Sequence, residues 1–298
     1  LWRGFSVEAV KGDWSLMQKL IRDAIADGNE NRYQYILAWM ARITQDPGGL
    51  RPGVAFAMRG RQGIGKGVFA SNFGSLLSNH FLQVAQSGQV TGRFNTHLKD
   101  CVLLFVDEGF WAGDKQAEGV IKNLVTEPTI TVEPKGKDIF QIKNNVNVII
   151  ASNSDWVVPA GLGERRFFTV DVNDCFKGNY DFFKELADQM DNGGREAMLY
   201  DLQEMNIAGV NLRDFERTEA LLEQIIESMT LVQKWWFTQL QRGAIKYDDE
   251  DSFKYKGKDH FISFKDEWPT SIPNNQLYKN FELFVGKMKG YLPVEAVF

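Results

Sequence analysis

A glycine-rich segment between two apolar runs constrains this chain more than any other part of its sequence. Residues 54–58 are apolar over the length of a buried strand, and residues 60–67 read GRQGIGKG. Residues 68–77 are apolar enough to predict a helix directly afterwards. A glycine-rich loop between a strand and a helix directs successive backbone N–H groups toward phosphate oxygens. The segment therefore predicts a nucleotide phosphate site whose glycines adopt conformations that a Cβ would forbid.

The loop follows the pattern GxxxxGK from Gly60 to Lys66, and Lys66 supplies a positive charge for the phosphates. The next position is normally Ser or Thr, whose hydroxyl holds Mg²⁺, but here it is Gly67. A glycine-rich turn on its own can also be no more than a tight connection. The residues expected to contact the nucleotide are Gly60, Gly63, Ile64, Gly65, Lys66, Gly67 and Val68.

A second motif supports the nucleotide site. The apolar run 102–106 ends in Asp107 and Glu108, as expected for the acidic strand of a nucleoside triphosphatase. Asp107 is predicted to hold the metal and Glu108 to polarise the attacking water. The alternative is a strand that ends in a solvated acidic turn. The two motifs together predict ATP and Mg²⁺ as cofactors.

Polar residues after two later strands complete the predicted catalytic set. Asn153 follows the apolar run 146–151, and a polar side chain at such a strand end can orient the lytic water. Arg165 and Arg166 precede another apolar strand, and either is a candidate for an arginine finger that reaches the nucleotide of a neighbouring subunit. Surface arginines often have no such role, and the sequence does not distinguish the two.

Basic residues between these motifs suggest contacts with nucleic acid. The runs 129–132 and 139–142 flank a Pro/Gly turn and predict a hairpin whose tip carries Lys135 and Lys137. Such a tip can grip a phosphate backbone, although exposed lysines on a hairpin are also ordinary. Arg93 and Asn95 are further candidates for phosphate or DNA contacts, with a solvated loop as the equal alternative.

The composition restricts the class of protein. The chain has a net charge of −5, which argues against bulk coating of nucleic acid and leaves local binding open. It has no run of 18 apolar residues, so we expect no membrane association. Two cysteines make no disulfide framework and suggest reducing cytoplasm, that of the host cell if a phage encodes the protein. The first residue is Leu1, which suggests a fragment of a longer protein.

Most of the chain resembles the ATPase region of phage and virus superfamily 3 helicases, in particular that of phage primase-polymerases and primase-helicases. The resemblance is carried by the order of five segments: 60–67, 105–108, the hairpin tip 133–137, 148–153 and 163–167. Gly67 departs from the general nucleoside triphosphatase pattern but is similar to some phage members. It leaves direct coordination of Mg²⁺ by the loop in doubt.

The resemblance implies an α/β fold of the P-loop AAA+ type, with a mostly parallel central sheet and flanking helical appendages. We expect a helical region at 1–50, the ATPase core at 51–175, and a C-terminal helical region at 176–298 with a small winged-helix-like tail. Within the last region, 218–240 reads as one long amphipathic helix.

The implied function is ATP-dependent movement on single-stranded DNA with unwinding of the duplex, in phage-type DNA replication. A homo-oligomeric ring, with a hexamer favoured, and a primase or polymerase domain upstream are the implied partners. Two alternatives stay open. One is an AAA+ ATPase that loads or packages DNA, and the other is a nucleotide-gated DNA-binding assembly module that hydrolyses slowly.

Overall fold

The computed structural model describes residues 2–85, 90, 92, 95–108, 115–242, 253–255, 258–260 and 272–288. The contacts between residues divide the chain into two compact units, Leu1–Glu227 and Ser228–Phe298. The region boundaries expected near residues 50 and 175 both fall inside the first unit. This unit is larger than the expected core because helices from before and after the sheet pack together in it.

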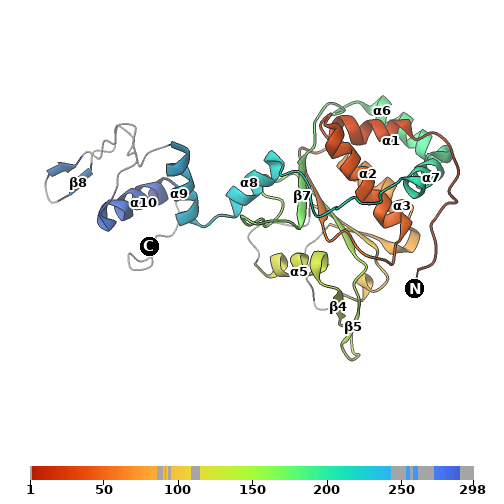
Figure 1. Ribbon diagram of the computed structural model, residues 1–298, viewed down its shortest axis with the longest axis horizontal. Helices are drawn as coiled ribbons and strands as arrows, with labels where there is room; N and C mark the ends of the chain where they lie inside the picture. The colour runs from red at the N-terminus through yellow and green to blue at the C-terminus, as the bar shows by residue number, and fades with distance from the viewer. Residues whose placement is uncertain are drawn as a thin grey trace. The chain divides into compact units, whose positions relative to one another are not determined.

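A five-stranded parallel sheet forms the centre of the first unit (Figure 1). Its spatial order is β2 (Phe81–Val84), β3 (Leu103–Asp107), β6 (Asn147–Ser152), β1 (Ala55–Arg59) and β7 (Phe167–Asp171). All four pairings between these strands are parallel. The strands consist of apolar runs because both faces of the sheet are covered. The predicted α/β fold with a mostly parallel sheet is confirmed.

The register aligns the strand ends at one edge of the sheet. Arg59, the last residue of β1, pairs with Ser152 of β6 and with Asp171 of β7. Asp107, the last residue of β3, pairs with Ala151 of β6. In a parallel sheet the carboxyl ends of the strands meet at the same edge, which is where ligands bind in open α/β folds.

Helices bury the two faces of this sheet. The helices α1 (Ser15–Lys19), α2 (Glu30–Gln45), α3 (Lys66–Ser75), α6 (Tyr180–Gln189) and α7 (Arg195–Glu204) share one apolar core with alternate residues of the strands. Figure 1 shows α5 (Lys115–Thr126) on the other side of the sheet, where it packs against β6. A π-helical segment, Leu20–Ile25, extends α1. Residues Met190–Gly194 connect α6 to α7 through a kink at Asn192 and Gly193, whose backbone angles are not helical.

Periodicity in the sequence predicted these helices well. In α2, for example, the apolar residues Tyr33, Ile36, Leu37, Met40 and Ile43 recur at helical spacing, and all are buried. Beside them the indole N–H of Trp39 donates a hydrogen bond to the Val54 carbonyl at 2.9 Å, just before β1 begins. That bond fixes α2 against the strand that leads into the glycine-rich loop.

A two-stranded antiparallel hairpin projects from the first unit (Figure 1). It consists of β4 (Thr129–Val132) and β5 (Phe140–Lys143), which match the predicted runs to within one residue. Gly136 in its turn has a φ of 72°, a left-handed conformation that suits glycine. The predicted hairpin is therefore confirmed.

The single helix expected over 218–240 is two helices, α8 (Glu219–Ser228) and α9 (Leu231–Arg242). The prediction is wrong because Thr230 and Gln233 form a reciprocal cap that starts a new helix. The Gln233 N–H donates to the Thr230 hydroxyl at 3.3 Å, and the Thr230 N–H donates to the Gln233 side chain at 2.9 Å. This Thr-x-x-Gln pattern is a capping box, which the amphipathic periodicity masks.

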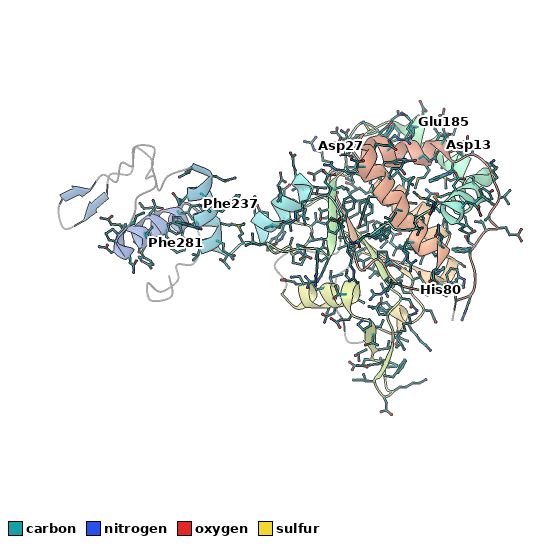
Figure 2. The ribbon with its side chains drawn as sticks, viewed as in Figure 1. Asp13, Asp27, His80, Glu185, Phe237 and Phe281 are labelled. Atoms are coloured by element: carbon teal, nitrogen blue, oxygen red, sulfur yellow. The ribbon has the colours of Figure 1, made fainter. Side chains whose placement is uncertain are left out.

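The second unit contains α9, α10 (Asn274–Met288) and the short strands β8 (Phe253–Tyr255) and β9 (Lys258–His260). Phe281, labelled in Figure 2, is fully buried beside Trp235 with the ring centroids 5.7 Å apart. The Trp235 indole N–H donates to Asn280 at 2.6 Å. The winged-helix-like architecture of this tail stays a prediction. Within the described ranges, no helix has the length and apolarity to span a membrane.

Candidate nucleotide-binding site

The glycine-rich loop has the backbone conformation that the sequence predicts. Gly60, Gly63 and Gly65 have φ angles of +148°, +79° and +102°, all in the region that other residues rarely adopt. A Cβ on Gly60 would lie 2.7 Å from Ile64, and one on Gly65 would lie 2.7 Å from Leu20. Gly65 directly precedes α3, which begins at Lys66, two residues before the predicted start. The loop therefore leads into the N-terminus of a helix, where phosphates bind.

The Lys66 side chain is buried and folds back over the loop. Its Nζ donates hydrogen bonds to Asn153 Oδ1 at 2.9 Å, to the Arg61 carbonyl at 2.8 Å and to the Gly60 carbonyl. Burial lowers the pKa of the ammonium group, and the charges of Glu108 and Asp107 oppose that effect. An anion that replaced the two loop carbonyls would pair with an ammonium that the protein already holds in place.

The strand order places Asp107 and Glu108 at the same edge of the sheet as the glycine-rich loop. β6 lies between β1 and β3, so Asn153, directly after β6, lies between the loop and the acidic pair. Asn153 Nδ2 donates a hydrogen bond to Glu108 Oε1, which links Lys66 to Glu108 through one amide. The predicted residues Lys66, Glu108 and Asn153 therefore form one hydrogen-bonded group.

The turn after β3 has an unusual backbone. Glu108 has a φ of 55°, and its N–H donates to the Ala151 carbonyl at 2.9 Å. A residue other than glycine in this conformation costs about 1 kcal/mol or more, and such strain concentrates at functional sites. Asp107 is half-buried and accepts a bond from Gln83 at 3.3 Å. Its partial burial, and after it the charge of Glu108, raise the pKa of Asp107.

These residues fit a magnesium nucleotide. Mg²⁺ at phosphoryl-transfer sites is held by one or two carboxylates together with phosphate oxygens, and Asp107 and Glu108 provide such carboxylates at the loop. Among the described residues there is no group of three or more His, Cys, Asp or Glu side chains that could hold a metal alone, and this mode of binding needs none. Gly67 has no hydroxyl to contribute.

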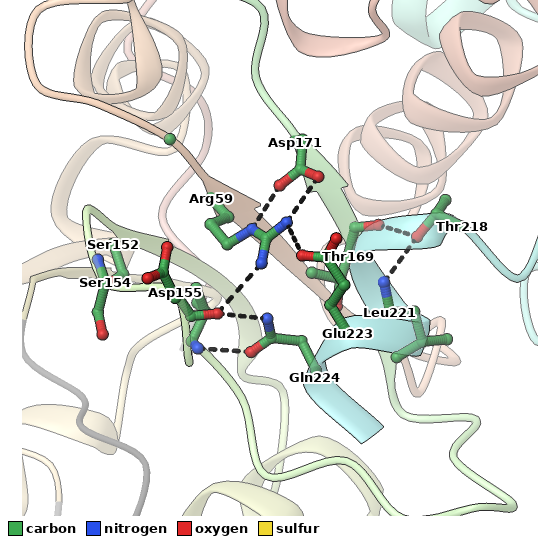
Figure 3. Close-up of polar contacts among 12 residues, drawn as sticks. Arg59, Ser152, Ser154, Asp155, Thr169, Asp171, Thr218, Leu221, Glu223 and Gln224 are labelled. Carbon is green, nitrogen blue, oxygen red and sulfur yellow. Dashed lines mark hydrogen bonds and ion pairs between the residues drawn. The ribbon is translucent and has the colours of Figure 1, made fainter. Parts of the chain in front are cut away.

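A cleft of about 410 Å³ adjoins this site. Gly60 and Asn153 line it on the side of the loop, and α8 contributes Glu223 on the other side. Arg59 also lines the cleft, and its guanidinium donates to Asp171 Oδ1 at 2.5 Å and to Oδ2 at 2.8 Å and pairs with Glu223 (Figure 3). The bonds to Asp171 raise the pKa of Arg59.

Two further contacts hold α8 at this edge (Figure 3). Gln224 Nε2 donates to the Asp155 carbonyl at 2.7 Å, and Gln224 Oε1 accepts from the Val158 N–H at 3.1 Å. The Thr218 hydroxyl donates to the Thr169 carbonyl and caps α8 by accepting from Leu221 at 3.1 Å. Sequence reasoning missed this network. Its one visible signal is Arg59, a charge at the end of an apolar strand and next to the glycine-rich loop.

The two candidate arginine fingers lie at the opposite edge of the sheet. Arg166 directly precedes β7, and its carbonyl accepts from Ala55 at the start of β1. Five strand residues at about 3.3 Å each separate this edge from Gly60, a distance of about 16 Å. Neither arginine is therefore at the nucleotide site of its own subunit.

The two arginines differ in their surroundings. The buried Glu164 carboxylate accepts from the backbone N–H of Arg165 at 3.0 Å and from that of Arg166 at 2.7 Å. The Arg166 guanidinium also pairs with this carboxylate at 3.5 Å. Arg165 is exposed, and its guanidinium makes no hydrogen bond or ion pair within the part of the chain that the structure describes. Arg165 is therefore the freer of the two.

Of the basic candidates for DNA contact, Lys135 and Lys137 are exposed on the β4–β5 turn. The side chain of Asn95 makes its contacts within the protein, and a role of Asn95 in DNA binding stays a prediction. Its amide donates to the Thr131 carbonyl at 2.8 Å and accepts from the Glu133 N–H at 3.0 Å, so it braces the hairpin. Arg93 lies outside the described residues.

Comparisons with known proteins found similarity to one protein family and to a DNA primase-polymerase of a phage. A family model described as a family of unknown function (DUF5906) matches residues 58–166, which run from the glycine-rich loop to the arginine pair. The curated DNA primase-polymerase of Nitratiruptor phage NrS-1 is 23% identical over 265 residues, which cover 84% of this chain and 36% of that protein. The chain thus spans about a third of the length of this relative.

Solved structures of the NrS-1 C-terminal region have a similar fold. The apo structure of residues 305–718 matches with a TM-score of 0.69 and 21% identity, over 80% of this chain and 57% of that one. An A-form apo structure of the same region matches with a TM-score of 0.68 and 19% identity, over 80% of this chain and 59% of that one. The comparisons relate this chain to the C-terminal region of a phage primase-polymerase.

Proposed function

We propose that this chain binds and hydrolyses ATP at the carboxyl edge of its central sheet. The observation that carries the proposal is the hydrogen-bonded group of Lys66, Asn153 and Glu108 beside a glycine-rich loop that leads into α3. This group joins a phosphate-binding cation to a carboxylate through a polar side chain. Phosphoryl transfer depends mainly on such positioning and charge stabilisation.

Each residue has a role in this proposal. Lys66 neutralises phosphate charge, and Asp107 holds Mg²⁺, which supplies further neutralisation on the phosphate oxygens. Glu108 accepts the proton of the attacking water, and Asn153 keeps the Glu108 carboxylate oriented. The positive φ of Glu108 fixes its backbone in the turn directly after β3. The core is a P-loop ATPase of the AAA+ type in this proposal.

Hydrolysis, we further propose, drives movement along single-stranded DNA and unwinding of the duplex in phage-type replication. The relationship to a DNA primase-polymerase of a phage supports this context. The projecting β4–β5 hairpin, with Lys135 and Lys137 at its turn, offers a contact to the phosphate backbone. Subunits form a ring in which Arg165 acts on the nucleotide of the neighbour, because Arg165 is exposed and too far from its own loop.

The test measures ATP turnover with and without single-stranded DNA, and strand displacement on a forked duplex. Lys66→Ala is expected to abolish turnover. Glu108→Gln is expected to keep ATP bound and to slow hydrolysis by about two orders of magnitude or more, as for the loss of a general base. Unchanged turnover in Glu108→Gln would contradict its role. ATP hydrolysis without strand displacement would favour an ATPase that loads or packages DNA.

The hairpin is tested separately. Lys135→Ala combined with Lys137→Ala is expected to weaken binding to single-stranded DNA and to reduce the dependence of that binding on salt, because fewer counterions are released. The matched control replaces Lys177 and Lys184, two exposed lysines of the first unit outside the hairpin, with alanine. An unchanged salt dependence in the hairpin variant would move the DNA contact elsewhere.

A nucleotide-gated assembly module with slow hydrolysis is the second candidate, and two observations favour it. Gly67 lacks the hydroxyl that usually helps to hold Mg²⁺, and Lys66 is satisfied by two carbonyls of its own loop. Tight binding of ATP with turnover that single-stranded DNA does not increase would support this candidate over the translocase.

A further inference from the structure

A second cleft, of about 790 Å³, lies between the segment that follows α2 and the segment that follows α7. Its lining includes Arg51 and Pro52, which precede β1, so it lies at the opposite edge of the sheet from the glycine-rich loop. The residues of β1 alone separate the two by about 16 Å. The two clefts share no lining residue. A ligand in the second cleft would therefore not contact the nucleotide site proposed above.

The charged side chains that line this cleft are all positive. Its fourteen lining residues include Arg42, Arg51 and Arg213 and no Asp or Glu, in a protein whose net charge is −5. Partial burial lowers the pKa of Arg51, and the charge of Arg213 lowers it further. Like charges that lie close together repel one another, and a bound anion reduces that repulsion. The cleft is therefore a local concentration of positive charge that an anion would neutralise.

The three arginines divide into one structural residue and two with free donors. Arg51 donates to the carbonyls of Leu124 at 2.7 Å and Glu127 at 2.6 Å, and thereby caps the C-terminal end of α5. Of the Arg42 guanidinium, only Nε donates a hydrogen bond within the described residues, to the Leu50 carbonyl at 2.8 Å. Across the described ranges, neither the Nη groups of Arg42 nor the guanidinium of Arg213 makes a hydrogen bond or ion pair.

Gly53 supports the position of Arg213. It has a φ of +69°, and a Cβ at this residue would lie 2.8 Å from Arg213 Nη2. The absence of a side chain at Gly53 therefore lets the Arg213 guanidinium pack against the backbone just before β1. This packing limits the rotamers of Arg213 and so reduces the entropy lost when it binds an anion.

The rest of the cleft is mainly apolar. Leu50 and Val210 leave 77% and 47% of their surfaces exposed, and Pro52, Ile207 and Leu212 also line the cleft. Clefts of about 300 to 1,000 Å³ with an apolar lining and a few charged groups are typical of sites for small ligands. Arginine pairs with phosphate through two parallel hydrogen bonds. The ligand should therefore combine a phosphate with an apolar or planar group.

We propose that this cleft is a second binding site, separate from the glycine-rich loop, for a nucleotide phosphate. Arg42 and Arg213 bind the phosphate, Arg51 contributes its charge, and Leu50 and Val210 contact the base or sugar. The nucleotide is either free or the phosphorylated end of a nucleic-acid strand, because both present the same chemistry. The site goes beyond the proposed ATPase and does not depend on it.

Titration calorimetry tests the proposal with three probes: dTMP, a 5′-phosphorylated thymidine trinucleotide and the same trinucleotide with a 5′-hydroxyl. The protein carries Lys66→Ala, which weakens phosphate binding at the glycine-rich loop. Arg42→Gln and Arg213→Gln are each expected to weaken binding of the phosphorylated trinucleotide about tenfold or more, as for a lost charged hydrogen bond. Arg217→Gln, which removes an exposed arginine outside the cleft, is the matched control and should bind as before.

The probes separate the two sources of phosphate. Equal affinity for dTMP and the phosphorylated trinucleotide indicates a free nucleotide, and a strong preference for the trinucleotide indicates a strand end. The proposal is overturned if no probe binds saturably, if the 5′-hydroxyl probe binds as well as the phosphorylated one, or if Arg42→Gln and Arg213→Gln leave affinity unchanged. ATP turnover of Arg42→Gln and Arg213→Gln with Lys66 intact should equal that of the wild type, which keeps this test distinct from that of the ATPase.

Discussion

Lys66 Nζ donates a hydrogen bond of 2.9 Å to the side-chain oxygen of Asn153, across the gap between α3 and the end of β6. The amide of Asn153 has a second function, because its nitrogen donates to the Glu108 carboxylate. One side chain therefore fixes the positions of a cation and an anion relative to each other. Among the described residues, Asn153 is the only side chain that forms a hydrogen bond with Lys66 and the only one that forms a hydrogen bond with Glu108.

Asn153→Ala is the direct test of that link. We expect ATP turnover to fall about 10² to 10³-fold, the usual effect of losing one precisely oriented polar group at a reacting centre. ATP affinity should change much less, because Lys66 keeps the charge that pairs with the phosphates. Steady-state kinetics together with nucleotide-binding titrations measure the two effects. Ser154→Ala, at the next exposed position, is the control, and equal turnover in Asn153→Ala and Ser154→Ala would exclude Asn153 from the mechanism.

Gly67 offers a test by gain of function. A Cβ at this residue would meet no atom within 4 Å, so a serine fits without rearrangement. We expect Gly67→Ser to reduce the Mg²⁺ concentration needed for half-maximal turnover, because its hydroxyl adds an oxygen ligand. Gly67→Ala adds the same Cβ without the hydroxyl and serves as the matched control. If both variants require as much Mg²⁺ as the wild type, this position does not face the metal.

The charge of Asp107 is expected to affect both ATP turnover and the stability of the folded chain. Its pKa is raised, first by burial and then by Glu108, so its ionised form is less favourable in the folded chain than in the unfolded chain. At a pH above the raised pKa, the charge therefore lowers the free energy of unfolding. We expect Asp107→Asn to melt at a higher temperature than the wild type at pH 7 while it loses ATP turnover.

The pH dependence of that difference is the decisive measurement. The melting temperatures of Asp107→Asn and of the wild type should converge as the pH falls through the raised pKa of Asp107. The difference should vanish below the ordinary pKa of an aspartate, about 3.9, where both states of the wild type are protonated. Asp138→Asn, at an exposed position of the hairpin turn, should show no such stabilisation. A lower melting temperature for Asp107→Asn at pH 7 would contradict the assignment.

The sequence was sufficient for the parts of the fold that depend on local pattern. Apolar runs predicted the strands, and the polar residues Asp107 and Asn153 lie at the carboxyl ends of β3 and β6, where the sequence placed the candidate site. The ion pair of Arg59 with Glu223 could not be predicted in this way, because it joins β1 to a helix far along the chain. Asn95 likewise braces a hairpin that begins more than thirty residues later, and its polarity alone indicated only a surface contact.

The arginine pair before β7 is the strongest test of a shared site. Arg165→Ala is expected to lower ATP turnover about 10³-fold while leaving stability unchanged, since fingers that stabilise transition-state charge contribute at this level. Arg166→Ala should instead lower the free energy of unfolding by about 1 to 3 kcal/mol, because the buried Glu164 carboxylate loses its side-chain partner and keeps only its backbone donors. Thermal unfolding and turnover of the two variants therefore separate the roles of two adjacent residues.

Mixing experiments then decide whether Arg165 acts between subunits. A Lys66→Ala subunit has an inactive site but an intact Arg165, and an Arg165→Ala subunit has an intact site but no arginine to contribute. If the arginine acts on the neighbour, the mixture of two inactive proteins should recover part of the turnover, and wild-type turnover should rise more steeply than linearly with protein concentration. Each of the two inactive proteins alone, at the same total concentration as the mixture, is the control. No recovery in the first mixture, together with turnover proportional to enzyme concentration through the range of dissociation, would exclude the shared site.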